Sequence, residues 1–284
     1  MPRNKLAKLV SISPQRLNHR IQQLEKQFLE PYVCLDYPSL GIESFILLYE
    51  NLEEEQLKSL YKSKNIYYAI HLAGNKRYLV LTITNDVLSF CSEHTPMTAP
   101  TILPVTAYIP DNWNGFDIKP LPRKLKKRIV RNLNKKDYKI LFELCKNPVA
   151  SQLELSEKVK MSRKTTKEKL EKLENCGIIQ KYRFSVNLPK IDLLNYVVIA
   201  TCFPNEVSKV IELIKTNSYS GFIHQSYNKL IFSSISFTHK QLFDFLEKIE
   251  KSTNSKIEVY QNTGNYIINP VPDYVKEILK ERSN

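Results

Sequence analysis

The apolar positions of one central segment, residues 134–192, predict three consecutive helices and a short ribbon. The first helix follows Asn134, an N-cap residue three positions ahead of Asp137, and its apolar residues recur at helical spacing. A second helix begins near Gln152, and a third follows Ser162, which favours the N-cap position. The sequence IIQKYRFSV then alternates apolar and polar side chains as a short β-ribbon does. The order predicts a winged helix-turn-helix.

The third expected helix has a thin apolar face and a strongly basic outer face. Its apolar positions are Thr166, by its methyl group, Leu170 and Leu173, which are spaced for one side of a helix. A partner rich in negative charge suits the opposite side, so we expect it to bind double-stranded DNA while the wing contacts phosphates. The alternative is a winged helix that serves only as a protein-interaction scaffold. The expected DNA-binding residues are Ser162, Arg163, Lys164, Thr165, Lys167, Lys169, Lys181 and Arg183.

This segment resembles the Lrp/AsnC (feast/famine) family of transcription regulators. The resemblance implies a prokaryotic DNA-binding regulator in which a winged helix precedes a ferredoxin-like RAM domain that dimerises and binds effectors. It rests on the start of the first helix, on LSEKVKMS at the second helix and turn, and on the step from helix to wing: Leu133, Asn134, Asp137, Ile140, Leu141, Leu173, Glu174, Gly177, Ile178, Ile179 and Tyr182.

The chain contains an internal repeat with an offset of about half its length. Residues 6–25 align without a gap to residues 155–174, so that Ser13 matches Ser162. Further along, YAIHLAGNK aligns with GFIHQSYNK, which pairs His71 with His224. The repeat indicates a tandem duplication. Its first copy lacks a counterpart of the first helix, so it is either a second DNA contact or a scaffold for assembly.

A strand-helix-strand-strand-helix-strand pattern follows each helix-turn-helix, which is the order of a ferredoxin-like unit. The fold class is therefore α+β, with two tandem units of a winged helix-turn-helix, the first truncated, and a βαββαβ RAM domain. Each sheet has one uncovered face, so we expect the two to stack face to face within the chain, with a homo-oligomer above that. The expected domains are a truncated winged helix (1–43), a first RAM-like domain (44–110), a basic linker (111–133), a complete winged helix (134–192), a second RAM-like domain (193–268) and a helical tail (269–284).

Positive charge is concentrated in the middle of the chain. Of the formal net charge of +13, +11 falls between residues 110 and 195. This distribution is typical of a module that binds nucleic acid, although a lysine-rich run is also common in a solvated linker. The residues expected to contact the DNA backbone are Lys124, Lys126, Lys127, Arg128 and Arg131 in the linker, with Arg16 and Arg20 in the first copy.

A second site is expected at the histidines and turns of the two RAM-like domains. In the Lrp/AsnC family the corresponding turn holds small-molecule effectors, and siroheme decarboxylases, which are similar in fold, carry a histidine and a Tyr-Asn pair there. A tetrapyrrole enzyme is therefore the alternative function, but we expect no enzyme, no catalytic residues and no cofactor. The expected effector-binding residues are His71, Gly74, Asn75, His224, Tyr227 and Asn228.

The cysteines and the hydropathy of the chain disfavour several classes of protein. The five cysteines are scattered and odd in number, which disfavours a disulfide framework and a zinc site, so no metal is expected. No run reaches the roughly 18 apolar residues of a membrane span, and the N-terminus lacks the apolar core of a signal peptide. We therefore expect a cytoplasmic, nucleoid-associated protein without a membrane partner.

Overall fold

The computed structural model describes residues 29–74, 77–109, 117–119, 133–186, 194–216, 220–236, 238–269 and 271–284, together with residues 13, 15–17, 19 and 23. Several expected site residues lie outside this set: Arg20, Asn75, Lys124, Lys126, Lys127, Arg128 and Arg131. Arg16 is described and is exposed. Within the described part, no helix is long and apolar enough to cross a membrane.

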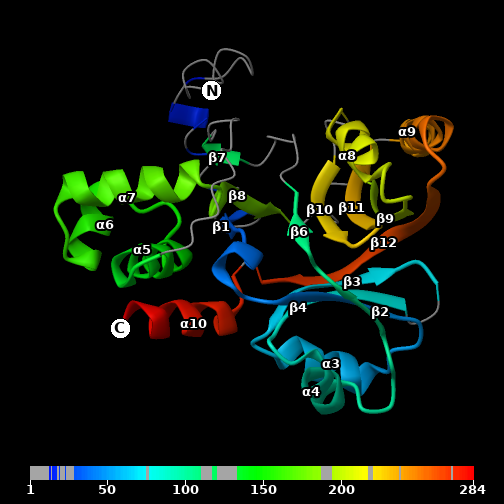
Figure 1. The fold of residues 1–284 in the computed structure, drawn as a ribbon, viewed down its shortest axis with the longest axis horizontal. Helices are drawn as coiled ribbons and strands as arrows, with labels where there is room; N and C mark the ends of the chain where they lie inside the picture. Colours follow the sequence, from blue (N-terminus) through cyan, green and yellow to red (C-terminus); the bar gives the residue numbers. More distant parts are fainter. Residues whose placement is uncertain are drawn as a thin grey trace.

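The three predicted helices of the central segment are present (Figure 1). They are α5 (Lys135–Lys146), α6 (Gln152–Val159) and α7 (Arg163–Asn175). The first two begin with capping boxes, at Asn134 and Ser151, in which the side chain of the N-cap and that of the third helical residue satisfy each other's backbone N–H. The prediction of a winged helix-turn-helix is confirmed.

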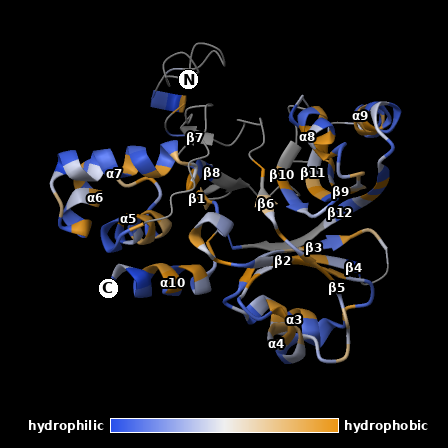
Figure 2. Ribbon diagram, in the orientation of Figure 1, coloured by the Kyte–Doolittle hydropathy of each residue, from blue (hydrophilic) through white to orange (hydrophobic). Residues whose placement is uncertain are grey.

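The C-terminal tail forms a fourth helix of this body, α10 (Asp273–Ser283), which packs against α5. Its Val275 and Leu279 are buried in the same apolar cluster as Leu141 and Leu144 of α5. Figure 2 shows hydrophobic residues on both helices where they lie side by side. The tail therefore completes the core of the winged helix from the far end of the chain.

Both ferredoxin-like patterns are also present, each with two helices on one face of its sheet. The helices of the first unit pack on one side of its strands, around Leu47 and Val80, and those of the second pack around Val198 and Phe232. The first unit consists of β2 (Ser44–Tyr49), α3 (Glu54–Lys62), β3 (Ile66–Leu72), β4 (Arg77–Ile83), α4 (Val87–His94), β5 (Thr101–Pro104) and β6 (Ala107–Tyr108); the second consists of β9 (Leu194–Thr201), α8 (Val207–Thr216), β10 (Ser220–Ser226), β11 (Lys229–Ser236), α9 (His239–Ser252) and β12 (Lys256–Ile268).

The two sheets lie face to face and are also joined at both edges. Their helix-free faces share one core, to which Ile70 and Leu79 contribute from the first unit and Val197 and Ile231 from the second. Strand β12 pairs with β9 along its first half and with β3 along its second half, while β6 pairs with β10 after β5 has paired with β2. Each unit thus contributes its last strand to the other, which leaves little open edge.

A separate three-stranded sheet changes the picture of the wing. It has the order β1-β8-β7, with β1 (Leu29–Leu35) and β7 (Asp117–Lys119) on either side of β8 (Ile179–Val186). The expected wing strand β8 is therefore the centre of a sheet rather than an outer ribbon. Its partner β1 comes from the N-terminal segment. A strand of residues 1–43 therefore belongs to the same sheet as the wing of residues 134–192.

Candidate functional site

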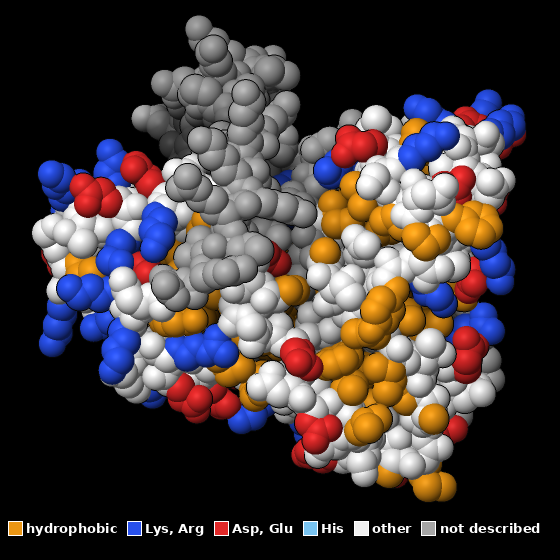
Figure 3. Space-filling model, in the orientation of Figure 1, with side chains coloured by type: hydrophobic (Ala, Val, Ile, Leu, Met, Phe, Trp, Pro, Cys, Tyr) orange, Lys and Arg blue, Asp and Glu red, His pale blue; other side chains and the backbone are white. Residues whose placement is uncertain are grey.

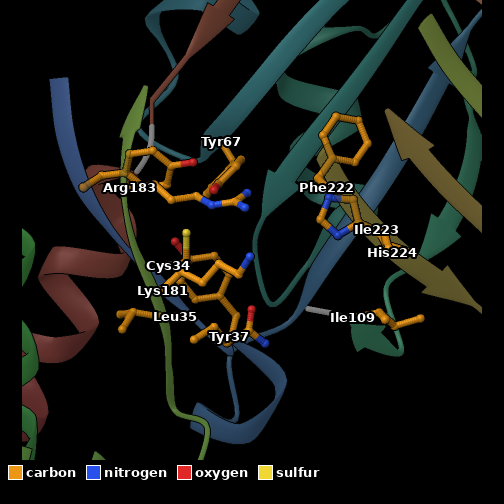
Figure 4. A pocket seen from close by; sticks show the side chains of 12 residues that line it. Cys34, Leu35, Tyr37, Tyr67, Ile109, Lys181, Arg183, Phe222, Ile223 and His224 are labelled. Carbon is orange, nitrogen blue, oxygen red and sulfur yellow. The ribbon is translucent and has the colours of Figure 1, made fainter. Parts of the chain in front are cut away.

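A partly open cavity lies where this wing sheet meets the second ferredoxin-like unit (Figure 4). Its volume is about 70 Å³. By the measure of roughly 10–15 Å³ for one water molecule, it has room for a few waters or one short polar group. The lining residues come from β1, β3, β8 and β10 and from the segments after β1 and β6: Tyr32, Cys34, Leu35, Tyr37, Tyr67, Ile109, Gln180, Lys181, Arg183, Phe222, Ile223 and His224.

Two cations reach this cavity from the wing strand. Side chains alternate between the faces of a strand, so Lys181 and Arg183 share one face of β8 while Tyr182 takes the other. Tyr182 is buried in the winged-helix core and donates a hydrogen bond to Glu174 Oε1 at 3.0 Å. Burial raises the pKa of its hydroxyl, helped by the Glu174 charge. In Figure 4 the side chains of Lys181 and Arg183 point from β8 into the cavity.

This placement corrects the expectation that Lys181 and Arg183 contact DNA from the wing. Arg183 is only 9% exposed. Its strand is covered on both edges by β1 and β7, and both cations line the cavity. The physical reason is that β8 pairs with β1 in an internal sheet. The face of β8 that carries the two cations therefore lies against the second ferredoxin-like unit. The positive charge of the wing therefore lies at the wall of the cavity, not on an outer surface.

On β10, His224 forms the opposite wall of the cavity. Its side chain is 2% exposed, and its ring stacks on Phe222 with a centroid separation of 5.0 Å and an interplanar angle of 20°. Burial lowers the pKa of His224 to about 3, because the charged imidazolium is poorly solvated there. The ring is therefore neutral near pH 7, and a neutral imidazole can accept a proton, donate a hydrogen bond or bind a metal.

The other expected effector residues are not brought to this cavity. His71 shares a hydrogen bond of 2.5 Å between its Nδ1 and Thr263 Oγ1. Its ring packs at a tilt of 34° against Tyr78 on the helix-covered side of its sheet. Gly74 lies in an exposed turn at φ +119°. Tyr227, which is 70% exposed, and Asn228 form the turn after β10. Of this set, only His224 lines the cavity.

The match of His71 with His224 is therefore wrong in register. Leu79 on β4 and Ile231 on β11 both point into the core between the sheets, and their strand partners are Ile70 and His224. Ile70, not His71, thus occupies the position in the first unit that corresponds to His224. A shift of one residue moves a side chain to the other face of a sheet, which is why the sequence alignment misplaced it.

The basic residues at the start of α7 form a second, outward-facing feature. Ser162 caps the helix by accepting a hydrogen bond from the Thr165 backbone N–H at 3.1 Å. Arg163, Lys164 and Lys167 are exposed, and Lys167 lies 3.7 Å from Glu171 on the same helix. Figure 3 shows Lys and Arg side chains gathered over the α5–α7 side of the molecule. This face keeps the exposure that binding to a phosphate backbone requires.

Lys169 does not belong to that face. Its Nζ lies 2.6 Å from Oδ1 of Asp137, whose side chain is completely buried, and 3.3 Å from Asn134 Oδ1. Lys172 also approaches Asp137, at 3.8 Å. The expected role of Lys169 in binding DNA is therefore replaced by a structural one, because its charge compensates the buried carboxylate that caps α5.

Sequence reasoning missed most of the cavity wall. Cys34, Tyr37 and Tyr67 line the cavity, yet no motif marks them, because they come together only through the pairing of β1 with β8 and the packing of β3. One signal was present, since Phe222 stands two residues before His224 and therefore shares its face of β10. Among the described residues, no group of three or more His, Cys, Asp or Glu side chains is placed to hold a metal ion.

Comparison with known proteins gives matches of different extent. A family model described as winged helix-turn-helix DNA-binding matches residues 133–180. No curated protein sequence matches the chain. Among solved structures, the siroheme decarboxylase NirDL has a TM-score of 0.55 and 15% sequence identity, covering 99% of this chain and 92% of that one, and its co-complex with an iron-uroporphyrin III analogue gives the same values. The match to LrpC of B. subtilis covers 46% of this chain and 95% of the LrpC chain, with 23% identity and a TM-score of 0.37.

These matches overturn one expectation. The full-length arrangement of this chain is similar to that of an enzyme, NirDL, and so the expectation that the protein is not an enzyme is wrong. At 15% identity the likeness establishes the fold of the whole chain. The chemistry has to be argued from the cavity itself.

Proposed function

We propose that this protein is an enzyme that decarboxylates an acidic side arm of a tetrapyrrole. The observation that carries the proposal is the cavity in which Lys181 and Arg183 face a buried, neutral His224. Two cations suit a carboxylate, since charge-assisted hydrogen bonds to carboxylate are the strong ones. The likeness to NirDL over nearly the whole chain supports a tetrapyrrole as the molecule that carries this carboxylate.

The size of the cavity decides which part of the substrate enters. About 70 Å³ accommodates a short carboxylate arm but not a macrocycle, which as a bulky ligand needs a pocket of roughly 300–1,000 Å³. In the proposed complex the arm enters between Arg183 and His224, and the ring remains at the open side. The enzyme then binds the reacting group and leaves the rest of the ring outside the enclosed volume.

In the proposed reaction, His224 takes up a proton when the substrate binds and donates it after decarboxylation. A carboxylate beside His224 adds negative charge and raises the pKa of the imidazole from its low value, so that binding brings a proton onto the ring from solvent. When the bond between the methylene carbon and the carboxyl carbon breaks, carbon dioxide leaves and the electron pair stays on the methylene carbon. The imidazolium donates its proton there, giving a methyl group and restoring neutral His224.

The test is anaerobic incubation of the purified chain with siroheme, followed by mass spectrometry of the tetrapyrrole. The expected result is a product that has lost the mass of carbon dioxide, together with a shifted absorption band on binding. Heat-denatured protein is the control. Unchanged siroheme and an unshifted band would remove the proposal.

A second candidate function is DNA binding through α7, which the exposed Arg163, Lys164 and Lys167 favour. The matched family model supports the same interpretation of this segment. In its finer form the candidate is a regulator of the Lrp/AsnC type in which the two ferredoxin-like units pair within one chain. Its test is the salt dependence of binding to duplex DNA, because a protein that neutralises phosphates releases counterions.

We also infer that the chain arose by tandem duplication. The shared order of strands and helices in residues 44–108 and 194–268, and the reciprocal exchange of the last strands, support this origin. Between the two units, it is β10 of the second that carries the histidine of the cavity wall, His224.

A further inference from the structure

We infer that Tyr68 of the first ferredoxin-like unit is a positioning residue for His224 of the second, so that the cavity is complete only when the two sheets are packed together. The inference rests on the proposed function for its consequence in catalysis. Its structural basis is independent of that function, since it concerns how one ring is held.

Three aromatic rings form a compact cluster across the interface between the sheets, in which each ring is near-parallel to the other two. Tyr68 stacks on Phe222 with centroids 5.1 Å apart and an angle of 24°, and Phe222 stacks on His224. Tyr68 also lies 6.1 Å from the His224 ring at 28°. Near-parallel rings within about 4.5–7 Å attract each other beyond the burial of their area, so the three planes fix one another.

The stack comes from two elements that do not pair as strands. Phe222 and His224 lie on β10, whose strand partners are β11 and β6, while Tyr68 lies on β3, which pairs with β4 and β12. Tyr68 thus reaches His224 only because the helix-free faces of the sheets meet. Its 3% exposure shows that it is buried in this interface.

Tyr68 is further anchored from the winged-helix side. Tyr67, a neighbour in sequence, contacts Tyr68 edge-on at 5.7 Å and Tyr37 edge-on at 6.2 Å. Tyr37 belongs to the winged-helix core, and both Tyr37 and Tyr67 line the cavity. An aromatic chain therefore runs from the winged helix through β3 to His224, and it holds the imidazole against the cavity from behind.

The first unit provides the matched control for this arrangement. His71 also packs against one tyrosine, Tyr78, with a centroid separation of 4.8 Å and a tilt of 34°, but it does so on the helix-covered side and at a partly exposed position. Replacing Tyr78 should therefore perturb His71 alone. Replacing Tyr68 should perturb His224 alone.

The experiment compares Tyr68→Leu, Tyr68→Phe and Tyr78→Leu by NMR of the histidine ring signals in the full chain, assigned with His224→Gln and His71→Gln. In Tyr68→Leu we expect the ring-current shift of His224 to decrease to the part that Phe222 causes, and its titration to move back toward the ordinary range, because the imidazole loses part of its packing. Tyr68→Phe should keep both signals, and Tyr78→Leu should leave His224 unchanged. An unaltered His224 spectrum in Tyr68→Leu overturns the inference.

A second measurement uses the unaltered protein and so does not depend on the variant folding. A nuclear Overhauser effect between the Tyr68 ring protons and the His224 imidazole is expected, and its absence would overturn the inference. Turnover of siroheme is measured separately on Tyr68→Phe and Tyr68→Leu. If the unaltered chain shows no turnover, the proposed function fails while the NMR result still decides how His224 is held.

Discussion

Two basic regions of one winged helix end in different surroundings. The cations of α7, Arg163, Lys164 and Lys167, remain exposed, whereas those of β8, Lys181 and Arg183, line a cavity. Both sets belong to the same basic segment, and sequence alone assigns them to one DNA-binding surface. The difference lies in strand pairing, because β1 and β7 cover β8 while nothing among the described residues covers the start of α7.

The comparison shows that the position of a charged side chain, exposed or lining a cavity, decides which ligand it can bind. Exposed cations on a helix interact with a phosphate backbone in a salt-dependent manner. Cations beside a buried imidazole bind an anion in a less polar medium, where each interaction is stronger. One segment can therefore support a nucleic-acid surface and a small-molecule site, and substitutions should separate the two.

The largest expected effect is on the cavity. His224→Leu gives the second unit the apolar character that Ile70 has in the first, and it removes the proposed proton donor. Turnover of siroheme should fall by about 10²–10⁴-fold, the usual contribution of a positioned acid or base. Binding to duplex DNA should stay as it is. Turnover near the level of the unaltered chain would remove His224 from the reaction.

The second-largest effect is expected on the stability of the winged helix, to which both basic regions belong. Asp137→Ala removes the capping carboxylate of α5 and leaves Lys169 without its 2.6 Å ion pair. The free energy of unfolding should fall by about 3 kcal/mol, as expected when one partner of a buried pair is removed. Denaturant unfolding measures this. Glu171→Ala, which removes only the exposed partner of Lys167, is the control and should change stability by less than about 0.5 kcal/mol.

The outcome for Asp137 illustrates how far the sequence could reach. The start of α5 was predictable, because capping boxes are local and the spacing of Asn134 and Asp137 is visible in the sequence. The ion pair with Lys169 was not, since it joins residues 32 apart in the chain on two helices. Lys169 therefore looked like part of the DNA-binding face.

The cavity was still harder to foresee. Its wall requires the pairing of β1 with β8, which sets Cys34 opposite Lys181. No local rule specifies such a distant partner. Of the two histidines that the sequence singled out, His224 lines the cavity, but it was matched with the wrong residue of the first unit, because a shift of one position exchanges the faces of a strand. The positions of the helices and the ferredoxin-like order were predictable. The strand faces on which the polar residues of the cavity lie were not.

A smaller effect should appear when pH is lowered. The pKa of His224 is about 3 in the folded chain and near its ordinary value when unfolded. Between these values the unfolded chain binds the extra proton, so the contribution of this group to stability is lost as pH falls. The slope should be at most roughly 1.4 kcal/mol per pH unit between about pH 6.5 and 3. His224→Gln should show a shallower slope, and identical slopes in both proteins would contradict the buried, neutral imidazole.

The smallest effect is expected on the outer face. Replacing Arg163, Lys164 and Lys167 together with alanine should lower the salt dependence of duplex DNA binding by about 0.9 in slope for each phosphate that is no longer neutralised. Turnover of siroheme should be unaffected, because none of these residues lines the cavity. An unchanged salt slope would take α7 out of the DNA interface.

The most direct test of the division between the two regions compares Arg183→Met with Arg163→Met in the same two assays. Both changes remove one positive charge from the winged helix. If Arg183 binds the carboxylate arm, Arg183→Met should weaken binding of siroheme by about 10- to 100-fold, the range for a hydrogen bond to a charged group, and leave DNA binding intact. Arg163→Met should do the reverse. Equal siroheme binding by the two variants, after their folding has been verified by thermal melting, would contradict the assignment of the cavity as the site of carboxylate binding.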